Sequence, residues 1–597
     1  MKKILWMLLS CLMVFSLVLA SCGDETAEKT TTEDDTEDTV KITESETSVG
    51  TDTGDEEEGM VSADIPKYGG YIVTPGGDPI GWDPAYFLNF MLVPNFITNE
   101  SLLTGDWARG PAGTGETDWT QGLIGRTDLM RGLLAESWEM PDDSTLLFHI
   151  RPGVHWWNKA PLNGREFIAE DAAWSITREW AGNSWLKFGN PPQDHIISAT
   201  ALDKYTLEIK VPSHAQGLQT FVTGESARLV PPELGDDMIT WETMVGTGPY
   251  MVADYVAGSS INYEKNPDYW DHDPLHPDNQ LPYLDGLRTP IISDLSTQQA
   301  GFRTGKLDMM GEVSYEDWEK FMGQRPDLQY MEVYASLPTF PCGRTDKQEL
   351  PFKNVKVRQA MNLAVNQQEM LDDYYEGHGA LLVYPFLPIP TFSDVYVPLE
   401  DMPEVVQELF TYNPEKAKQL LAEAGYPDGF KTKIICTTGE VDLLSIIKEY
   451  LLIVGIEMEL QPGEGGMVTA QVKGRQVEEM CMSMTYPFAV WKMLNLRAES
   501  TSNPSYFETP QTKAAYNKVL EYIGKDSMAM LRVLKDTAPH VLEYSWGIWL
   551  PAPSRYNMWQ PWIQNYHGEI NIASSSIAGA WRIYVWIDQE LKTSMGY

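Results

Sequence analysis

The chain is poor in cysteine and in positive charge. Its 597 residues include five cysteines and no Cys-x-x-Cys pair, so neither a dithiol redox motif nor a thiolate zinc site has support. Lysine and arginine total 44 against 85 aspartates and glutamates, which gives a formal net charge of −41. Nucleic-acid-binding proteins carry a basic surface, so we expect no nucleic acid among the partners of this chain.

Catalytic signatures are missing as well. The sequence contains no Gly-x-Ser-x-Gly, no phosphate-binding Gly-x-x-x-x-Gly-Lys and no His-Glu-x-x-His motif. Two histidines and three aspartates occur in the run Asp271–Asp278, but two prolines restrict it, and we interpret it as a polar surface loop. We therefore expect no enzymatic activity, no cofactor and no bound metal. An extracellular hydrolase with paired carboxylates is a distant alternative.

Long apolar runs are absent except at the start of the chain. Lys2 and Lys3 precede an apolar run over residues 4–20, a pattern typical of a secretory signal. A cysteine directly after Leu-Ala-Ser, at Cys22, resembles the lipobox of bacterial lipoproteins. This resemblance implies a signal peptide over residues 1–22, a lipid on Cys22 and an extracytoplasmic, membrane-anchored protein. A plain signal peptide or an N-terminal membrane helix is the alternative.

The next segment, residues 23–64, is acidic and rich in threonine. It holds sixteen acidic residues, two lysines, ten threonines and no aromatic residue. Such a segment buries too little apolar surface to offset the entropy of ordering it. We predict a disordered tether that holds a globular body away from a membrane.

The remaining residues alternate between short apolar strands and amphipathic helices. Residues 206–211 alternate with period two, whereas residues 295–304 and 414–425 have helical spacing and end at glycine. This alternation predicts a mixed α/β fold. Cys342, Cys436 and Cys481 lie in this part, and two interpretations stay open: one disulfide with one free thiol, or three reduced cysteines.

Five blocks of this part resemble one family in order and spacing. The blocks are 134–154 with 161–175, 246–250 with 266–270, 281–285 with 305–308, 351–360, and 412–430. They are similar to the family 5 solute-binding proteins of bacterial ABC importers, the oligopeptide-, dipeptide- and nickel-binding group. The resemblance implies a bilobed periplasmic-binding-protein-like α/β fold with a hinged cleft and an extra inserted domain. It also implies a monomer that delivers a solute, most often a peptide, to importer permease subunits.

The resemblance further implies a division of the chain and a ligand site. Domain I is expected at residues 65–100, 243–325 and 558–597, the inserted domain II at 101–242, and domain III, the second lobe, at 326–557. Ligand is expected between the lobes, against two stretches of the chain, residues 77–82 and 482–491. The expected ligand-binding residues are Gly77, Asp78, Trp82, Met484, Thr485, Tyr486 and Trp491.

The identity of the ligand stays open at this point. Peptide-binding members carry an aspartate for the peptide's α-amine where this chain has Thr485, and no acid occurs from Cys481 to Arg497. A buried ammonium group without a carboxylate partner is costly, so this departure weakens the peptide prediction. The 20 tryptophans suggest an alternative, an oligosaccharide or another non-peptide solute. Trp156, Trp157, Trp546 and Trp549 are candidates for further stacking surfaces, and the other interpretation is that most tryptophans pack in the core or at the hinge.

Overall fold

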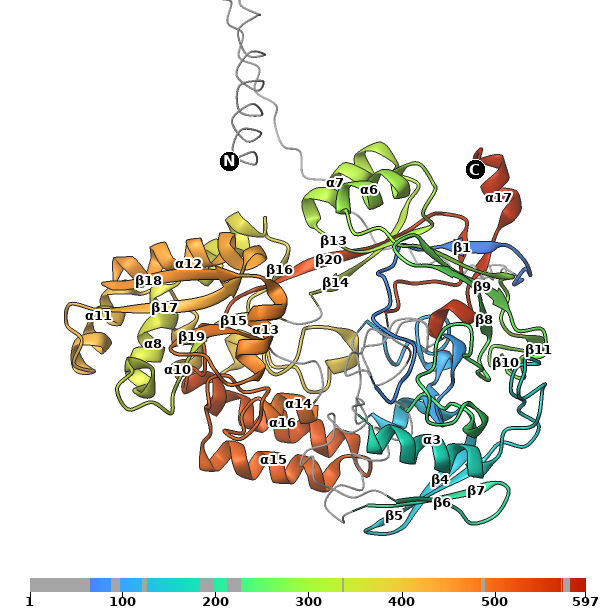
Figure 1. The fold of residues 1–597 in the computed structure, drawn as a ribbon. Coiled ribbons are helices and arrows are strands. Elements are labelled where there is room, and N and C mark those ends of the chain that lie inside the picture. Colours follow the sequence, from blue (N-terminus) through green and yellow to red (C-terminus); the bar gives the residue numbers. More distant parts are fainter. Residues whose placement is uncertain are drawn as a thin grey trace, which may run out of the picture. The chain divides into compact units, whose positions relative to one another are not determined.

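The computed structural model describes residues 65–86, 97–120, 126–182, 198–211, 227–335, 338–484, 489–570, 572 and 580–597. The chain divides into two units, Met1–Asp64 and Ile65–Tyr597, and all described residues belong to the second. The predicted signal peptide, Cys22 and the predicted tether therefore lie outside the described residues. In the second unit the predicted mixed α/β class is confirmed (Figure 1).

Four four-stranded sheets form the framework of this unit. Sheet A has the order β1-β12-β9-β8, sheet D the order β4-β5-β7-β6, and sheet H the order β15-β19-β17-β18. In sheet G, β20 lies between β13 and β14 and also pairs with β16. Their bounds are β1 Tyr71–Val73, β4 Ala135–Asp142, β5 Thr145–Ile150, β6 Ser198–Ala201, β7 Thr206–Lys210, β8 Tyr250–Val256, β9 Ser260–Lys265, β12 Gly286–Pro290, β13 Met309–Val313, β14 Gln329–Tyr334, β15 Thr339–Gly343, β16 Gly379–Ala380, β17 Phe430–Thr437, β18 Ile456–Gly463, β19 Met480–Met484 and β20 Ala552–Trp559.

Helices cover the sheets and fill the space between them. α3 packs against sheet D, α12 against β18, and α15 against α16. The α-helices are α3 Ala169–Ala181, α6 Leu295–Arg303, α7 Tyr315–Gln324, α8 Val355–Ala364, α9 Gln367–Glu369, α10 Glu404–Leu409, α11 Pro414–Glu423, α12 Val441–Ile453, α13 Gly465–Lys473, α14 Ala489–Leu494, α15 Pro510–Tyr522, α16 Ser527–Glu543 and α17 Gln589–Ser594. In the described ranges, no helix combines the length and apolar character needed to cross a membrane.

Short pairs of strands and single helical turns complete the secondary structure. The pairs are β2 Leu103–Gly105 with β3 Met130–Gly132, β10 His272–Asp273 with β11 His276–Gln280, and β21 Ile563–Gln564 with β22 Trp586–Ile587. The turns are the 3-10 helices η1 Trp107–Arg109, η2 Thr127–Leu129, η4 Pro232–Leu234, η5 Pro351–Lys353, η7 Pro390–Phe392, η8 Leu399–Asp401, η9 Thr438–Glu440 and η10 Ala580–Ile583, and the π-helix η6 Met370–Tyr374.

Local sequence explains where several of these elements begin and end. α11 begins with Pro414, the Asn413 side chain caps it by accepting from the Lys416 N–H, and Gly425 follows at φ 94°. α6 is capped by Asp294, and Gly305 lies beyond its end at φ 68°. Proline favours the first turn of a helix and glycine the left-handed conformation after its end, so both helices form close to their predicted positions.

The run Asp271–Asp278, interpreted above as a polar surface loop, is mostly the β10–β11 hairpin. Asp271 and Asp273 are buried, at 7% and 0% exposure. Asp271 forms an ion pair of 2.6 Å with Arg131, and Asp273 accepts a hydrogen bond of 2.7 Å from the Tyr283 hydroxyl. The interpretation as a polar surface loop is wrong because β10 and β11 pair as strands and both aspartates are buried. In the described residues no group of three or more metal-ligating side chains is placed to hold an ion.

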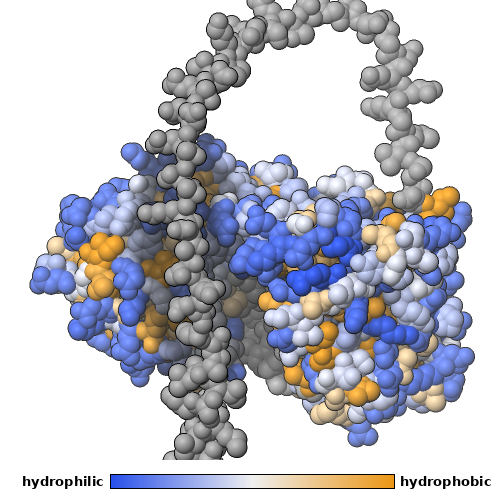
Figure 2. All heavy atoms as spheres, turned by 90° about the horizontal axis from the view of Figure 1, so that it is seen from above, coloured by the Kyte–Doolittle hydropathy of each residue, from blue (hydrophilic) through white to orange (hydrophobic). Residues whose placement is uncertain are grey.

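The surface is polar, in agreement with the composition. The described residues in the view of Figure 2 are mainly hydrophilic, with small, scattered apolar patches. Many tryptophan side chains are inside: Trp107, Trp119, Trp156, Trp157, Trp546 and Trp562 are among the largest fully buried residues.

Candidate ligand-binding site

A cavity of about 480 Å³ lies where sheet G meets sheet H. Strands β17, β18 and β19 are parallel, so their carboxyl ends share one edge of sheet H. β15 is antiparallel and begins at that edge, with Thr339 opposite Met484. Thr339 lines the cavity, as do Glu312 of β13 and Arg555 of β20. We call this space the inter-sheet cavity; its lining residues are Glu312, Ala335, Pro338, Thr339, Tyr374, Tyr375, Gly439, Glu440, Leu443, Pro551, Pro553 and Arg555.

The inter-sheet cavity has the size and position of a small-molecule site. Ligand pockets in proteins typically enclose about 300–1,000 Å³. In open α/β sheets, ligands bind outside the carboxyl ends of the parallel strands. β14 and β20 run beside each other toward sheet H in Figure 1. The cavity lies beside β20, which supplies Pro553 and Arg555 to its lining.

Carboxylates and a guanidinium group both line this cavity. Glu440 closes a capping box: its Oε2 accepts from the Thr437 N–H at 2.7 Å and from the Thr437 hydroxyl at 3.0 Å. Glu312 has a left-handed backbone with φ 56°, a conformation that costs energy outside glycine. The Arg555 guanidinium donates to the Ser554 carbonyl at 3.3 Å and forms no ion pair with any carboxylate in the described part of the chain.

Two tyrosines add hydrogen-bonding groups to the lining. Tyr374 and Tyr375 come from the end of η6 and pack edge to face, with ring centroids 4.8 Å apart. Burial raises the pKa of Tyr375 to about 12. Its hydroxyl is therefore protonated at neutral pH and available to donate a hydrogen bond.

The first predicted ligand stretch lies against sheet A and helix α3. Gly77 has open space at its Cα, and Asp78 accepts hydrogen bonds from the Tyr255 hydroxyl at 2.6 Å and the Gly258 N–H at 2.9 Å. Trp82 is 7% exposed and packs edge to face on Tyr255. None of these three residues is among the described residues that line the inter-sheet cavity.

A buried ion pair fixes the chain directly after Trp82. Asp83 is fully buried, and both of its carboxylate oxygens accept from Arg178 of α3, at 2.8 and 2.6 Å. The same carboxylate accepts from the backbone N–H groups of Ala85 and Ile239. These bonds lock the position of Trp82 relative to α3.

The second predicted stretch is only partly described. Met484 ends β19 next to the inter-sheet cavity, through its partner Thr339. Thr485 and Tyr486 lie outside the described residues. Trp491 lies in α14, where only its backbone is described.

Helix α14 is attached by an unusual buried lysine. Lys492 is 4% exposed, and its ammonium group donates to the Pro385 carbonyl. The amine also lies 5.1 Å from the ring centroid of Phe386 and 6.0 Å from that of Phe392. Burial lowers the pKa of Lys492 to about 7.

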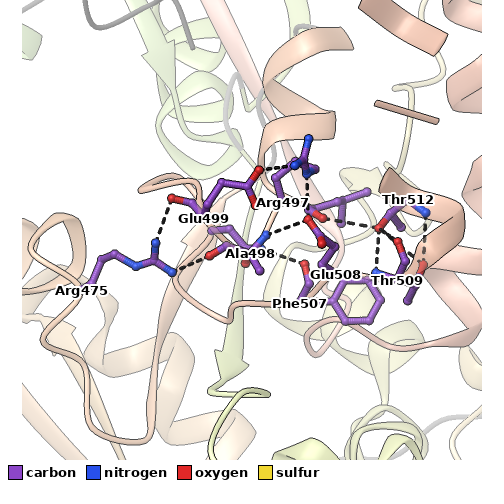
Figure 3. Close-up of polar contacts among 10 residues, drawn as sticks. Arg475, Arg497, Ala498, Glu499, Phe507, Glu508, Thr509 and Thr512 are labelled. Carbon is purple, nitrogen blue, oxygen red and sulfur yellow. Dashed lines mark hydrogen bonds and ion pairs between the residues drawn. The ribbon is translucent and has the colours of Figure 1, made fainter. Parts of the chain in front are cut away.

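The loop after α14 is held by a network of charged groups (Figure 3). Arg497 lies between two carboxylates, with its Nε 2.7 Å from Glu508 and a second contact to Glu499. Arg475 donates to the carbonyls of Ala498 at 2.5 Å and Glu499 at 2.9 Å. Thr509 caps α15 in this network, so the segment from α14 to α15 has a defined path.

The tryptophans expected to stack on sugars are not exposed. Trp156, Trp157, Trp546 and Trp549 are at most 4% exposed. Trp546 and Trp549 pack on Phe340, and the Trp157 Nε1 donates to the Gly248 carbonyl at 3.0 Å. The idea that these four form a stacking surface is wrong, because their rings belong to the hydrophobic core.

Glu440 and Arg555 were absent from the predicted site. The sequence holds a local signal for Glu440, since Thr437-x-x-Glu440 after a strand is a capping box at a helix start. Arg555 has no such signal, because its place in the cavity depends on the pairing of β20 with strands more than 200 residues earlier.

The chain has the fold of solved bilobed periplasmic binding proteins. The periplasmic binding protein DppA of Helicobacter pylori, solved in complex with the peptide STSA, is 20% identical, with a TM-score of 0.65 over 87% of this chain and 99% of that one. HbpA2 of Haemophilus parasuis is 19% identical, with a TM-score of 0.66 over 87% and 99%.

The sequence comparisons establish the family. A model described as "Bacterial extracellular solute-binding proteins, family 5 Middle" matches residues 130–509, more than half of the chain, so the chain belongs to this family. Heme-binding protein A of Haemophilus influenzae is 31% identical over 328 residues, 52% of this chain and 56% of that protein. The dipeptide-binding protein of Escherichia coli is 29% identical over 328 residues, 51% and 57%. The chain thus spans little more than half the length of these two relatives.

Proposed function

We propose that this chain is an extracytoplasmic receptor that captures a short peptide between two lobes and delivers it to an ABC-type importer. Membership of the family supports the receptor class, and a dipeptide-binding protein is among the relatives. A heme-binding protein is also among them, so the relatives do not select the ligand. The chemistry of the inter-sheet cavity carries the peptide assignment.

The cavity presents opposite charges to a bound molecule. Glu440 lies at the edge of sheet H, whereas Arg555 lies on β20 of sheet G, so the two charges come from the two sheets that enclose the space. An unmodified short peptide carries an ammonium group at one end and a carboxylate at the other. In our proposal Glu440 pairs with the ammonium group and Arg555 with the carboxylate.

This assignment accounts for the missing acid at Thr485. The ammonium group still needs a carboxylate partner, because an unpaired buried charge costs several kcal/mol. One oxygen of Glu440 is held by Thr437, which fixes the carboxylate. Its other oxygen has no hydrogen-bond partner among the described residues and can accept from a ligand. Glu312, on the opposite wall, is a second acid in the same cavity.

Closure of two lobes fits a set of hydrogen bonds between residues of the two proposed lobes. We propose the domain division given above, in which β14 and β20 lie at the boundaries near residues 325 and 557 and act as the hinge. Thr391, in the proposed second lobe, donates to Asp118 at 3.1 Å and contacts the Thr117 hydroxyl at 3.2 Å. Both partners belong to the proposed inserted domain, so these bonds would form when the lobes close.

We further propose that residues 1–22 are a lipoprotein signal and that Cys22 carries the lipid. Cys22→Ser is expected to release the protein from the membrane fraction without altering ligand affinity. Unchanged membrane partition of this variant would contradict the anchor.

The predicted residues Gly77, Asp78, Trp82, Met484, Thr485, Tyr486 and Trp491 stay part of the proposed ligand region. Trp82→Ala and Trp491→Ala are each expected to weaken binding by more than about 1 kcal/mol. If both variants bind like the wild type, ligand contacts are confined to the inter-sheet cavity.

Calorimetry with three forms of one dipeptide tests the ligand chemistry. Alanyl-leucine is compared with its N-acetyl derivative and its C-terminal amide, and each blocked form is expected to bind at least about tenfold more weakly. Glu440→Gln keeps the cap, because glutamine also completes a capping box. This variant is expected to weaken binding of the free dipeptide at least about tenfold and to leave binding of the N-acetyl form unchanged.

Control variants test which charged residue pairs with the ammonium group of the peptide. Glu449→Gln changes an exposed carboxylate of α12, the helix that directly follows Glu440, and is expected to have no effect. A loss of affinity in Glu312→Gln but not in Glu440→Gln would transfer the ammonium site to β13. Equal binding of all three dipeptide forms would refute recognition of a zwitterion.

A further inference from the structure

Two of the three described cysteines face each other across neighbouring strands of sheet H. Cys342 of β15 and Cys481 of β19 are direct partners in the antiparallel register. Their exposed fractions are 2% and 1%, and both are free thiols in this structure. Interaction with Cys481 is the main cause that raises the pKa of the Cys342 thiol, as expected for two thiols that lie side by side on neighbouring strands.

The third cysteine lies on the opposite face of the same sheet. β17 pairs with β19 in parallel, and Ile435 is the partner of Cys481. Successive side chains of a strand point to opposite faces, so Cys436 points away from the face that Cys342 and Cys481 share. Of the three possible pairs among these cysteines, sheet H permits only Cys342 with Cys481.

The backbone distance suits a covalent bond. Residues directly opposite in an antiparallel pair have Cα atoms about 4.5 or 5.5 Å apart. Disulfides span Cα distances of about 4.4–6.8 Å. The bond therefore needs a rotation of two side chains and no separation or sliding of the strands.

We propose that Cys342 and Cys481 form a disulfide in the exported protein. The thiolate of one cysteine attacks the disulfide of an extracytoplasmic thiol–disulfide oxidant, forms a mixed disulfide and displaces one thiolate of the oxidant. The second cysteine thiolate then attacks the mixed disulfide, closes the Cys342–Cys481 bond and releases the reduced dithiol. The two cysteines lose two electrons and two protons, and the oxidant gains them.

This reaction belongs to an early stage of folding. Both sulfurs are buried in the finished sheet, and burial together with the contact between the thiols raises the pKa of Cys342 well above its usual range. The thiolate, which is the reactive form, is thus suppressed once β15 and β19 have packed. The bond forms while the chain is still open to the oxidant.

The bond would stiffen one wall of the inter-sheet cavity. β15 begins with Thr339, a lining residue, and β19 ends at Met484, directly before the predicted stretch that follows it. A link three positions from each of these residues holds the two strand ends in register. This effect of the disulfide does not depend on which ligand the cavity accepts.

Peptide mapping of the full-length exported protein tests the proposal. The protein is unfolded without reductant, alkylated and digested with trypsin, which releases Cys342 in residues 321–344, Cys481 in 476–492 and Cys436 in 434–448. We expect the first two peptides as one linked species that reduction separates, and the third as an alkylated single peptide.

A matched variant completes the design. Cys436→Ser is expected to leave the linked species unchanged, because its side chain lies on the other face of sheet H. Full alkylation of Cys342 and Cys481 before reduction would overturn the proposal, and so would a linked species that contains residues 434–448. Ligand affinity is not part of this readout, so the result is independent of the proposed peptide site.

Discussion

Replacement of Lys492 by methionine is expected to stabilise the protein in a pH-dependent way. Lys492 is buried, and burial lowers its pKa from 10.5 to about 7. Between these two values the unfolded chain binds more protons than the folded one, so the free energy of unfolding rises with pH. Below pH 7 both states are protonated, and the destabilisation is at its full extent.

The magnitude follows from the two pKa values. One pKa unit corresponds to 1.36 kcal/mol, so Lys492 destabilises the folded state by about 4 kcal/mol at pH 7 and about 2 kcal/mol at pH 9. Lys492→Met removes this effect but leaves the Pro385 carbonyl without its donor, at a pH-independent cost of about 1–3 kcal/mol. The net stabilisation at pH 7 is therefore about 1–3 kcal/mol, and it falls by about 2 kcal/mol at pH 9.

Urea unfolding at the two pH values measures this difference. Lys431→Met serves as the control, since its ammonium group is at the surface beside Glu457 at 2.7 Å, and it is expected to show no comparable pH dependence. A stability difference between Lys492→Met and wild type that is the same at pH 7 and pH 9 would refute the reasoning, because Lys492 would then be fully charged in the folded protein.

Three further predictions follow from named contacts. Asp83→Asn leaves the buried Arg178 guanidinium without its carboxylate and is expected to lower the free energy of unfolding by about 3–5 kcal/mol in urea; a loss under about 1 kcal/mol would contradict this. Burial alone would raise the pKa of Glu508, but the Arg497 guanidinium outweighs burial, so the pKa of Glu508 is lowered. The ion pair therefore stabilises the folded protein fully above the unfolded-state pKa of Glu508. This stabilisation is lost as the pH falls through the lower folded-state pKa. Glu508→Gln should thus lower the melting temperature at neutral pH and lose this effect in acid, whereas an equal loss at both pH values would exclude the ion pair as its cause. Thr391→Val removes the bond to Asp118 and should weaken dipeptide binding up to about tenfold and expand the protein in small-angle scattering; unchanged scattering and affinity would rule out a role in closure.

Local elements could be predicted where the signal is local. The strand expected at 206–211 is observed as Thr206–Lys210, and the helices expected at 295–304 and 414–425 as Leu295–Arg303 and Pro414–Glu423. Period-two alternation, caps and terminal glycines act over a few residues, so they can be recognised without knowledge of the fold.

The cavity could not be predicted in this way. Glu312, Thr339, Glu440 and Arg555 come from four separate segments, and only the pairing of β13, β15 and β20 with distant strands brings them together. The tryptophans show the reverse problem. Their number suggested stacking surfaces, but composition does not say which rings face the core, and Trp156 and Trp546 are buried.

The most direct test of the central claim is mass spectrometry of whatever remains bound to the purified protein, released by denaturation. We predict a set of short, unmodified peptides, whose free amine and carboxylate match Glu440 and Arg555 across the inter-sheet cavity. A released heme, sugar or metal chelate in place of peptides would contradict the account.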